Sequence, residues 1–118
     1  MVRRILIVED DRDVRMLLQH VLLDAGYAVD CAESVGAARA LLREQSYDLV
    51  LTDGKLADGS GIAVADDAVA RDMKAIVVTG YSLQLAAAGL DRHDFLMKPV
   101  RPHEILDAVA RRIGAAAG

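Results

Sequence analysis

The stretch ILIVEDD, residues 5–11, decides how this chain folds. Four apolar residues run directly into three acidic ones, Glu9, Asp10 and Asp11. A short apolar run that ends in this way predicts a buried strand with carboxylates at its carboxyl end. Carboxylates crowded into one small site are costly to bury and repel one another, which a cation placed among them relieves.

Similar apolar runs recur along the chain, and helical patterns follow them. The runs predicted to form strands are residues 5–8, 28–32, 49–52, 75–79 and 94–97. An apolar stripe over residues 14–25 predicts the first helix, which Gly26 ends. Ser34 is predicted to cap a helix through residue 45, and further helices are predicted over 62–71, 83–89 and from Pro102 to residue 113.

This order is a strand followed by a helix, five times. Strands that are apolar throughout are expected to be buried on both faces, so the sheet is predicted to be parallel and doubly wound, with helices on each side. In such α/β sheets, ligands bind outside the carboxyl ends of the strands.

Composition limits the classes of function. The chain has 118 residues, of which 53% are hydrophobic, so we expect one domain over 1–118. Its net charge of −4 argues against direct nucleic-acid or anionic-membrane binding. Cys31 is the only cysteine, which excludes an internal disulfide, and the apolar run around it predicts a packed thiol.

The two ends of the chain also carry expectations. The first residues lack a run long enough for a signal peptide or a membrane span, which predicts a cytoplasmic protein. The tail GAAAG, residues 114–118, is expected to be frayed or to begin a linker. Met1 stands just before the first strand, so we expect a stand-alone domain or the amino-terminal domain of a longer protein.

Charged and hydroxyl side chains stand at the predicted strand ends: Glu9 and Asp10, Asp53, Thr79 and Lys98. In a parallel sheet they converge on one rim. Their oxygen ligands favour a hard cation, and Mg²⁺ fits best because it combines carboxylates with phosphate oxygens. With a lysine and a hydroxyl beside one carboxylate, the set predicts a phosphoryl-transfer site with that carboxylate as nucleophile.

Each residue also has a simpler interpretation when it is taken alone. Carboxylates after a strand cap the next helix, which is the expected main role of Asp11. An aspartate before a glycine is usually a turn residue, a threonine at a strand end forms a local hydrogen bond, and a lysine is usually solvated. The phosphoryl-transfer interpretation depends on finding all of them at the ends of four strands.

The chain resembles the receiver domain of bacterial two-component response regulators over essentially its whole length. The matching stretches are ILIVEDDRDVR (5–15), DLVLTDGKLADGSG (48–61), IVVTGYS (76–82) and DFLMKPV (94–100). The resemblance implies a flavodoxin-like sheet of five parallel strands in the order 2-1-3-4-5.

The resemblance also implies roles at the metal and phosphoryl site. Asp53 is expected to accept a phosphoryl group from a histidine kinase or phosphotransfer protein. Glu9, Asp10, Asp53 and the backbone carbonyl of Lys55 are expected to hold Mg²⁺. Lys98 is expected to pair with the phosphoryl oxygens, and its bond to Pro99 to be cis.

Two further residues are implied to report phosphorylation. Thr79 is expected to swing toward the phosphoryl group, and Phe95 to turn inward on activation. An ordinary core aromatic is the alternative for Phe95. The change is expected to reach an output face that is formed by the fourth helix, the fifth strand and the fifth helix.

The chain departs from the family pattern in places. Ala57 stands where proline is usual, which predicts a looser loop, and Lys55 places a second cation beside the site unless it is simply solvated. The connections from Asp53 to Thr79 and from Thr79 to Lys98 are short, so the third helix is expected to lack about a turn and the fourth to be short or partly disordered.

The function predicted from the sequence is therefore a phosphorylated receiver that serves regulation rather than turnover. The alternative is a pseudo-receiver, a protein-binding module that is not phosphorylated. An aspartyl phosphatase would need another acid beside Asp53, where Gly54 and Lys55 stand. The effector or output domain remains unidentified, and a homodimer remains open.

Overall fold

The computed structural model describes residues 2–80 and 89–116. A five-stranded parallel sheet forms its centre, in the order β2-β1-β3-β6-β7. The strands are β1 (Arg4–Val8), β2 (Ala28–Ala32), β3 (Leu49–Asp53), β6 (Lys74–Thr79) and β7 (Asp94–Met97). Numbered among these five alone, that order is 2-1-3-4-5, so the predicted doubly wound fold is confirmed.

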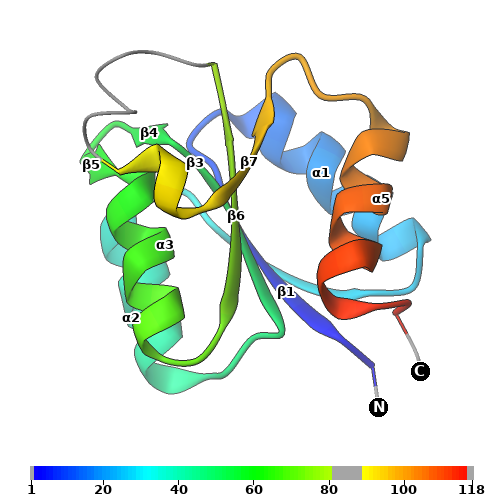
Figure 1. Ribbon diagram of the computed structural model, residues 1–118, viewed down its shortest axis with the longest axis horizontal. Coiled ribbons are helices and arrows are strands. Elements are labelled where there is room, and N and C mark those ends of the chain that lie inside the picture. Colours follow the sequence, from blue (N-terminus) through cyan, green and yellow to red (C-terminus); the bar gives the residue numbers. More distant parts are fainter. Residues whose placement is uncertain (1, 81–88, 117–118) are drawn as a thin grey trace.

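Helices cover both faces of the sheet (Figure 1). Helices α2 (Val35–Glu44) and α3 (Gly61–Ala70) lie on one face, and α1 (Arg12–Asp24) and α5 (Pro102–Ile113) lie on the other. Each of these four helices agrees with its predicted range to within a few residues. Within the described residues, no helix is both long and apolar enough to span a bilayer.

Alternation along the central strands divides the core into two clusters. Leu6 and Val8 of β1 face α2 and α3, whereas Ile5 and Ile7 face α1 and α5. All four are fully buried. Successive side chains of a strand point to opposite faces, so a run of apolar residues supplies both layers at once.

Burial on both faces holds for the three central strands but not for the two edge strands. β2 is only partly buried over most of its length, and Phe95 and Met97 of β7 are exposed. The prediction that every strand is enclosed was therefore wrong at the edges, where a strand has a neighbour on one side only.

The first helix also differs from its predicted stripe. Leu18 and Leu22 are buried, but Leu17 is half exposed on the outer side. Gly26 ends the turn after α1 with φ of 98°, a backbone conformation that glycine adopts without strain. Asp11 caps α1 by accepting a hydrogen bond from the Val14 N–H at 3.1 Å, as predicted.

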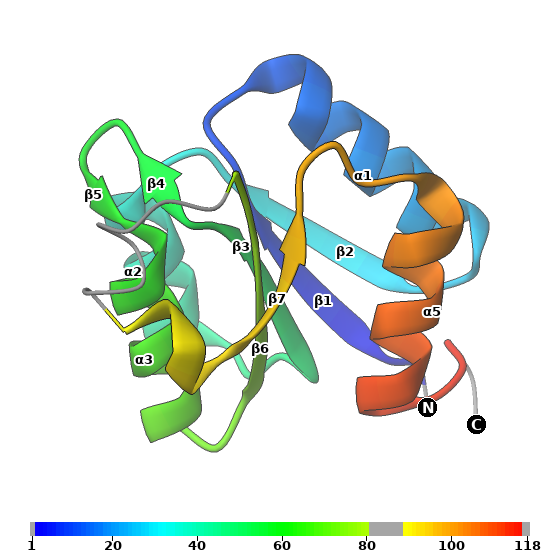
Figure 2. The ribbon, with the colours of Figure 1, turned by 45° about the horizontal axis from the view of Figure 1, so that its top comes forward.

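The loop after β3 forms a hairpin that the sequence analysis did not predict. Its strands are β4 (Lys55–Leu56) and β5 (Gly59–Ser60), paired antiparallel. Figure 2 shows the hairpin beside the carboxyl ends of the central strands. The loop around Ala57 was expected to be looser, but the short strands on either side of it are paired and Leu56 is buried.

The predicted fourth helix, residues 83–89, lies almost entirely outside the described residues. The description resumes at Gly89, which has φ of 107° and precedes a 3₁₀ turn, η1 (Leu90–Arg92). The Leu90 side chain is 1% exposed and joins the core on the α2 and α3 side.

Part of the carboxyl-terminal tail is packed rather than frayed. The Tyr27 hydroxyl donates to the carbonyl oxygen of Gly114, and the Arg3 N–H donates to that of Ala116, each at 2.8 Å. Ala116 is 8% exposed and lies against Gly26. These two hydrogen bonds hold residues 114–116 beside the amino ends of β1 and β2, and the alternative that the tail begins a linker stays a prediction.

Candidate functional site

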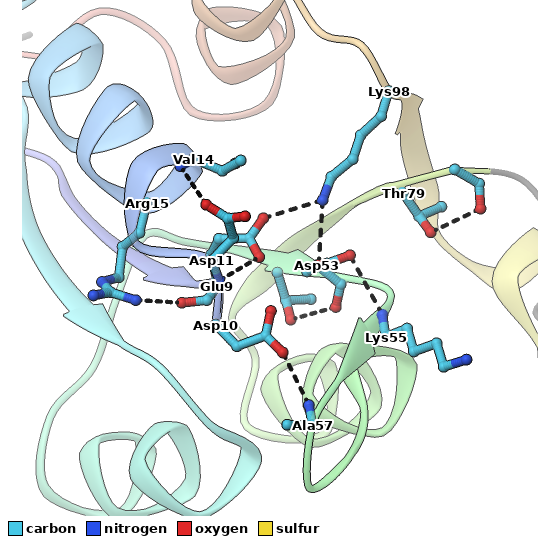
Figure 3. A network of polar contacts seen from close by, with 12 residues as sticks. Glu9, Asp10, Asp11, Val14, Arg15, Asp53, Lys55, Ala57, Thr79 and Lys98 are labelled. Carbon is cyan, nitrogen blue, oxygen red and sulfur yellow. Dashed lines mark hydrogen bonds and ion pairs between the residues drawn. The ribbon is translucent and has the colours of Figure 1, made fainter.

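The register of the sheet brings the predicted strand-end residues to one rim. Val8 pairs with Thr52, so Glu9 and Asp53 follow on neighbouring strands. Thr79 pairs with Met97, and the Lys98 N–H donates to the Thr79 carbonyl at 2.9 Å. The chain therefore gathers Glu9, Asp10, Asp53, Thr79 and Lys98 where the sequence predicted them (Figure 3).

Glu9 is the most enclosed acid of the group, with 2% of its surface exposed. Its Oε2 accepts a hydrogen bond from the Asp11 N–H at 3.2 Å, and its Oε1 accepts one from Lys98 Nζ at 3.2 Å. Burial, followed by the nearby charge of Asp53, raises the pKa of Glu9 to about 7. Both of its oxygens are thus held in place inside the rim.

Lys98 bridges two carboxylates. Its Nζ lies 3.2 Å from Glu9 Oε1 and 3.2 Å from Asp53 Oδ2. Partial burial opposes its charge, but the charge of Asp53 and the contacts with Glu9 outweigh this and raise the pKa of Lys98. The Lys98–Pro99 peptide bond is cis, which confirms the prediction.

Asp53 is the carboxylate at the centre of the group. Its side chain is 11% exposed, so it can be reached from solvent. Oδ2 faces Lys98, and Oδ1 accepts a hydrogen bond from the Lys55 N–H at 3.4 Å. Figure 3 shows the Lys55 side chain directed away from Asp53, as expected of a solvated lysine.

Asp10 lies on the exposed side of the rim, opposite the hairpin. Its Oδ2 accepts a hydrogen bond from the Ala57 N–H at 3.0 Å. Figure 3 shows the other carboxylate oxygen of Asp10 directed toward the space between Glu9 and Asp53. The hairpin therefore fixes the direction in which Asp10 faces.

Two glycines allow the backbone to approach this closely. A Cβ added at Gly61 would lie 1.5 Å from the carbonyl oxygen of Asp53, and one added at Gly54 would lie 2.8 Å from Thr79 Oγ1. Both distances are shorter than nonbonded contact permits. Glycine at these two positions therefore lets the start of α3 lie against the Asp53 backbone and lets Thr79 lie against Gly54.

The two predicted switch residues have different surroundings. Thr79 is 3% exposed, and its hydroxyl donates to the Gly80 carbonyl at 3.1 Å. Phe95 is 40% exposed on β7, which excludes the alternative of an ordinary core aromatic in this conformation. The movements expected of both residues on activation stay predictions.

The three acids form a donor set suited to a hard cation. Glu9, Asp10 and Asp53 each offer one carboxylate oxygen, and these oxygens lie within 4.8 Å of one another. Every donor is an oxygen, which is the preference of Mg²⁺, and the concentration of negative charge exceeds what the single Lys98 ammonium can neutralise. The residues therefore fit the predicted metal.

Sequence reasoning missed the backbone donors around the acids. The N–H groups of Asp11, Lys55 and Ala57 each bind one of the three carboxylates. The Arg15 side chain also donates to the Glu9 carbonyl at 3.0 Å. Main-chain donors leave no signal in residue types, and the six-residue separation of Glu9 and Arg15 is not a helical neighbour spacing.

Comparison with known proteins agrees with this geometry. The model of the response regulator receiver domain matches residues 5–110. The acid tolerance regulatory protein ActR of Rhizobium meliloti (strain 1021) is 35% identical over 119 residues, which cover 95% of this chain and 60% of ActR. The response regulator protein PilR of Pseudomonas aeruginosa is 36% identical over 113 residues, which cover 92% of this chain and 25% of PilR.

Solved structures show the same architecture. A CheY-like response regulator receiver domain protein from Methanospirillum hungatei JF-1 superposes with a TM-score of 0.87 at 32% identity, covering 96% of this chain and 94% of that one. The response regulator TrrA of Thermotoga maritima, in complex with Mg²⁺ and BeF, gives 0.83 at 29% identity, covering 92% and 97%. The chain belongs to the family of response regulator receiver domains of two-component signalling.

Proposed function

We propose that Asp53 accepts a phosphoryl group in the presence of Mg²⁺ and that this modification switches the domain. The observation that carries the proposal is the contact of Lys98 Nζ with Asp53 Oδ2 and Glu9 Oε1, beside three convergent carboxylates. A nucleophilic carboxylate, a fixed ammonium and a hard-cation donor set are the parts that phosphoryl transfer requires.

The transfer uses Asp53 as nucleophile. An Asp53 carboxylate oxygen forms a bond to phosphorus while the phosphorus–nitrogen bond of a phosphohistidine breaks, which leaves an acyl phosphate and the histidine ring. Glu9, Asp10, Asp53 and the Lys55 carbonyl are the proposed Mg²⁺ ligands, and the bound ion would offset the charge of the phosphoryl oxygens. Lys98 holds Asp53 in position before transfer and supplies a positive charge afterwards.

The proposed switch begins at Thr79. Its hydroxyl donates a hydrogen bond to the Gly80 carbonyl, which is a neutral acceptor. Charged phosphoryl oxygens are stronger acceptors and can take over this hydrogen bond. Phosphorylation adds about −1.5 to −2 charge and strong acceptor oxygens at the rim. Thr79 is paired with Met97 on β7. A movement of Thr79 can therefore be transmitted along β7 to Phe95, two residues before Met97.

The proposed partners follow from the family. The phosphoryl donor is a histidine kinase or a phosphotransfer protein, and the recipient of the signal is an effector or an output domain. The chain spans 60% of the length of ActR and about a quarter of that of PilR. The activity of those longer proteins supports an output outside this domain without identifying it.

The test is phosphorylation by a small donor. The full chain is incubated with acetyl phosphate and Mg²⁺, and its intact mass is measured. We expect one added phosphoryl group in the wild type, none in Asp53→Asn, and none when EDTA removes the metal. Asp107→Asn removes a carboxylate from the exposed surface of α5 and serves as the matched control that keeps the modification.

Absence of the added mass in the wild type would contradict direct phosphorylation by small donors. The same assay with a phosphorylated histidine-containing transfer protein then separates the two remaining functions. Phosphoryl transfer to Asp53 from that protein retains the proposal, whereas no transfer makes the chain a pseudo-receiver that acts by binding alone.

A further inference from the structure

The hairpin turn places a backbone donor against one carboxylate of the acidic rim. The Ala57 N–H lies 3.0 Å from Asp10 Oδ2, from a segment that is 47 residues away in sequence. Ala57 stands where the family usually has proline, and proline has no N–H. This chain therefore holds a hydrogen bond to Asp10 that the usual family residue cannot make.

The donor is held firmly in place by contacts on both sides of it. Leu56, which precedes it, is 5% exposed and pairs with Gly59 across the hairpin. Asp58, which follows it, accepts hydrogen bonds from the Val35 N–H at 2.8 Å and the Gly36 N–H at 3.2 Å. The direction of the Ala57 N–H is thus set by the core and by the first turn of α2.

The hydrogen bond orients Asp10 without using up its ligating capacity. A carboxylate has two oxygens, and only Oδ2 faces Ala57. The other oxygen faces the space between Glu9 and Asp53 (Figure 3). Asp10 is otherwise exposed, so without the donor its side chain would have to lose rotational freedom when it binds a cation.

We infer that Ala57 is a positioning residue for the metal site: its N–H fixes Asp10 in a metal-binding orientation and tightens the binding of Mg²⁺. The inference rests on the proposed function, because it assigns the acidic rim to Mg²⁺. A competing effect is that the donor withdraws charge from Asp10, which would weaken binding. The orientation effect prevails if removal of the N–H lowers the affinity.

Substitution of proline for Ala57 removes the donor. Leu56 lies in a β-strand, the conformation that a residue before proline prefers. Mg²⁺ affinity is measured by isothermal titration calorimetry on the full chain. We expect Ala57→Pro to weaken Mg²⁺ binding by about three- to tenfold, which is the size of the typical net contribution of one hydrogen bond.

Ala57→Ser retains the N–H and serves as the matched variant. It should bind Mg²⁺ to within about twofold of the wild type, since its backbone donor is the same. Unchanged or tighter binding by Ala57→Pro overturns the inference, and so does equal weakening by Ala57→Ser. Failure of the wild type to bind Mg²⁺ at all would instead overturn the proposed metal site together with this inference.

A second measurement does not depend on the folding of Ala57→Pro. The amide proton of Ala57 is followed by NMR in the wild type and in Asp10→Ala during titration with Mg²⁺. We expect a downfield resonance that Asp10→Ala abolishes and that persists in the wild type at saturating Mg²⁺. Its upfield movement on saturation would show that metal binding breaks the bond, and would overturn the inference.

Discussion

Glu9 and Asp53 are both carboxylates at the ends of neighbouring strands, but they differ in exposure. Glu9 is 2% exposed, whereas the Asp53 side chain is 11% exposed. Burial disfavours the charged form of an acid, and a nearby negative charge does so as well. Both effects act on Glu9 and raise its pKa to about 7, so in the absence of metal it carries a proton up to neutral pH.

The raised pKa of Glu9 predicts that the metal-free protein loses stability between about pH 4.5 and pH 7. The folded state holds the Glu9 proton more tightly than the unfolded state. The contribution is therefore fully present below the unfolded pKa and is lost as the pH rises through the folded pKa. The difference amounts to at most about 3 kcal/mol. Urea unfolding in EDTA at pH 5 and pH 8 measures it.

Glu9→Gln isolates this effect, because glutamine has a similar shape and does not titrate. The free energy of unfolding of Glu9→Gln should fall less than that of the wild type between the two pH values. Equal falls in the two proteins would show that Glu9 titrates at its ordinary pKa.

For single residues, the sequence predicted the candidate site wherever the chemistry depends on a side chain. Glu9, Asp10, Asp53 and Lys98 were predicted because strand ends in a parallel sheet converge. The donor at Ala57 was not, because every residue except proline has an N–H, and only the tertiary fold decides where it points. The one sign of it in the sequence was alanine at position 57, where the family usually has proline. That difference predicted a looser loop rather than an added hydrogen-bond donor.

Helix α2 begins with two separate caps. Ser34 accepts a hydrogen bond from the Ala37 N–H at 3.0 Å, and Asp58 accepts from the Val35 and Gly36 N–H groups. Three backbone N–H groups of the first turn are thus satisfied. One of the two caps, Asp58, comes from the hairpin turn. The two backbone hydrogen bonds lower the pKa of Asp58 below its ordinary value of 3.8.

We expect Asp58→Ala to lower the thermal midpoint at pH 7 and to have little effect in strong acid. A depressed pKa gives stability that is present above the unfolded pKa and is lost as the pH falls through the folded pKa. Thermal unfolding of the wild type and Asp58→Ala is compared at pH 7 and below pH 3. The difference between the two midpoints should shrink at the lower pH.

Asp107→Ala provides the reference for this comparison, because Asp107 is an exposed aspartate on α5. Its midpoint should follow that of the wild type at both pH values. A loss in Asp58→Ala that persists undiminished in acid would show that the hairpin acts through packing rather than through the carboxylate.

Elements with a strong periodic pattern were predictable from the sequence, and short ones were not. Helices α1, α2 and α5 have apolar stripes and end signals, and their bounds agree closely with prediction. The hairpin has two residues in each strand, too few to show a period. Exposure of β2 and β7 could not be inferred from composition alone, because an apolar strand is compatible with the edge or the centre of a sheet.

The whole molecule has two apolar cores on either side of one sheet, and the acidic rim lies where the central strands leave them. Its three acids come from two segments, the end of β1 and the end of β3. A cation held by all of them can bind only when these segments are folded together. We therefore expect metal binding at this rim to be coupled to folding.

We expect Mg²⁺ to stabilise the chain by mass action, by about 2.7 kcal/mol at 100 times its dissociation constant. Thermal or urea unfolding is followed with increasing Mg²⁺ at constant ionic strength. Asp10→Asn should lose most of the gain because one of the three carboxylates is neutralised. Sodium chloride at matched ionic strength provides the control, and an equal gain with that salt would contradict specific binding.

The packed residues at the end of the described chain have a topological consequence. The Arg3 N–H and the Ala116 carbonyl are hydrogen-bonded, so the first strand and the last residues meet at one corner (Figure 1). The described backbone therefore begins and ends close to the same corner. A short linker between its ends, with new ends opened at an exposed turn far from the rim, should give a circular permutant with the same sheet and acidic site.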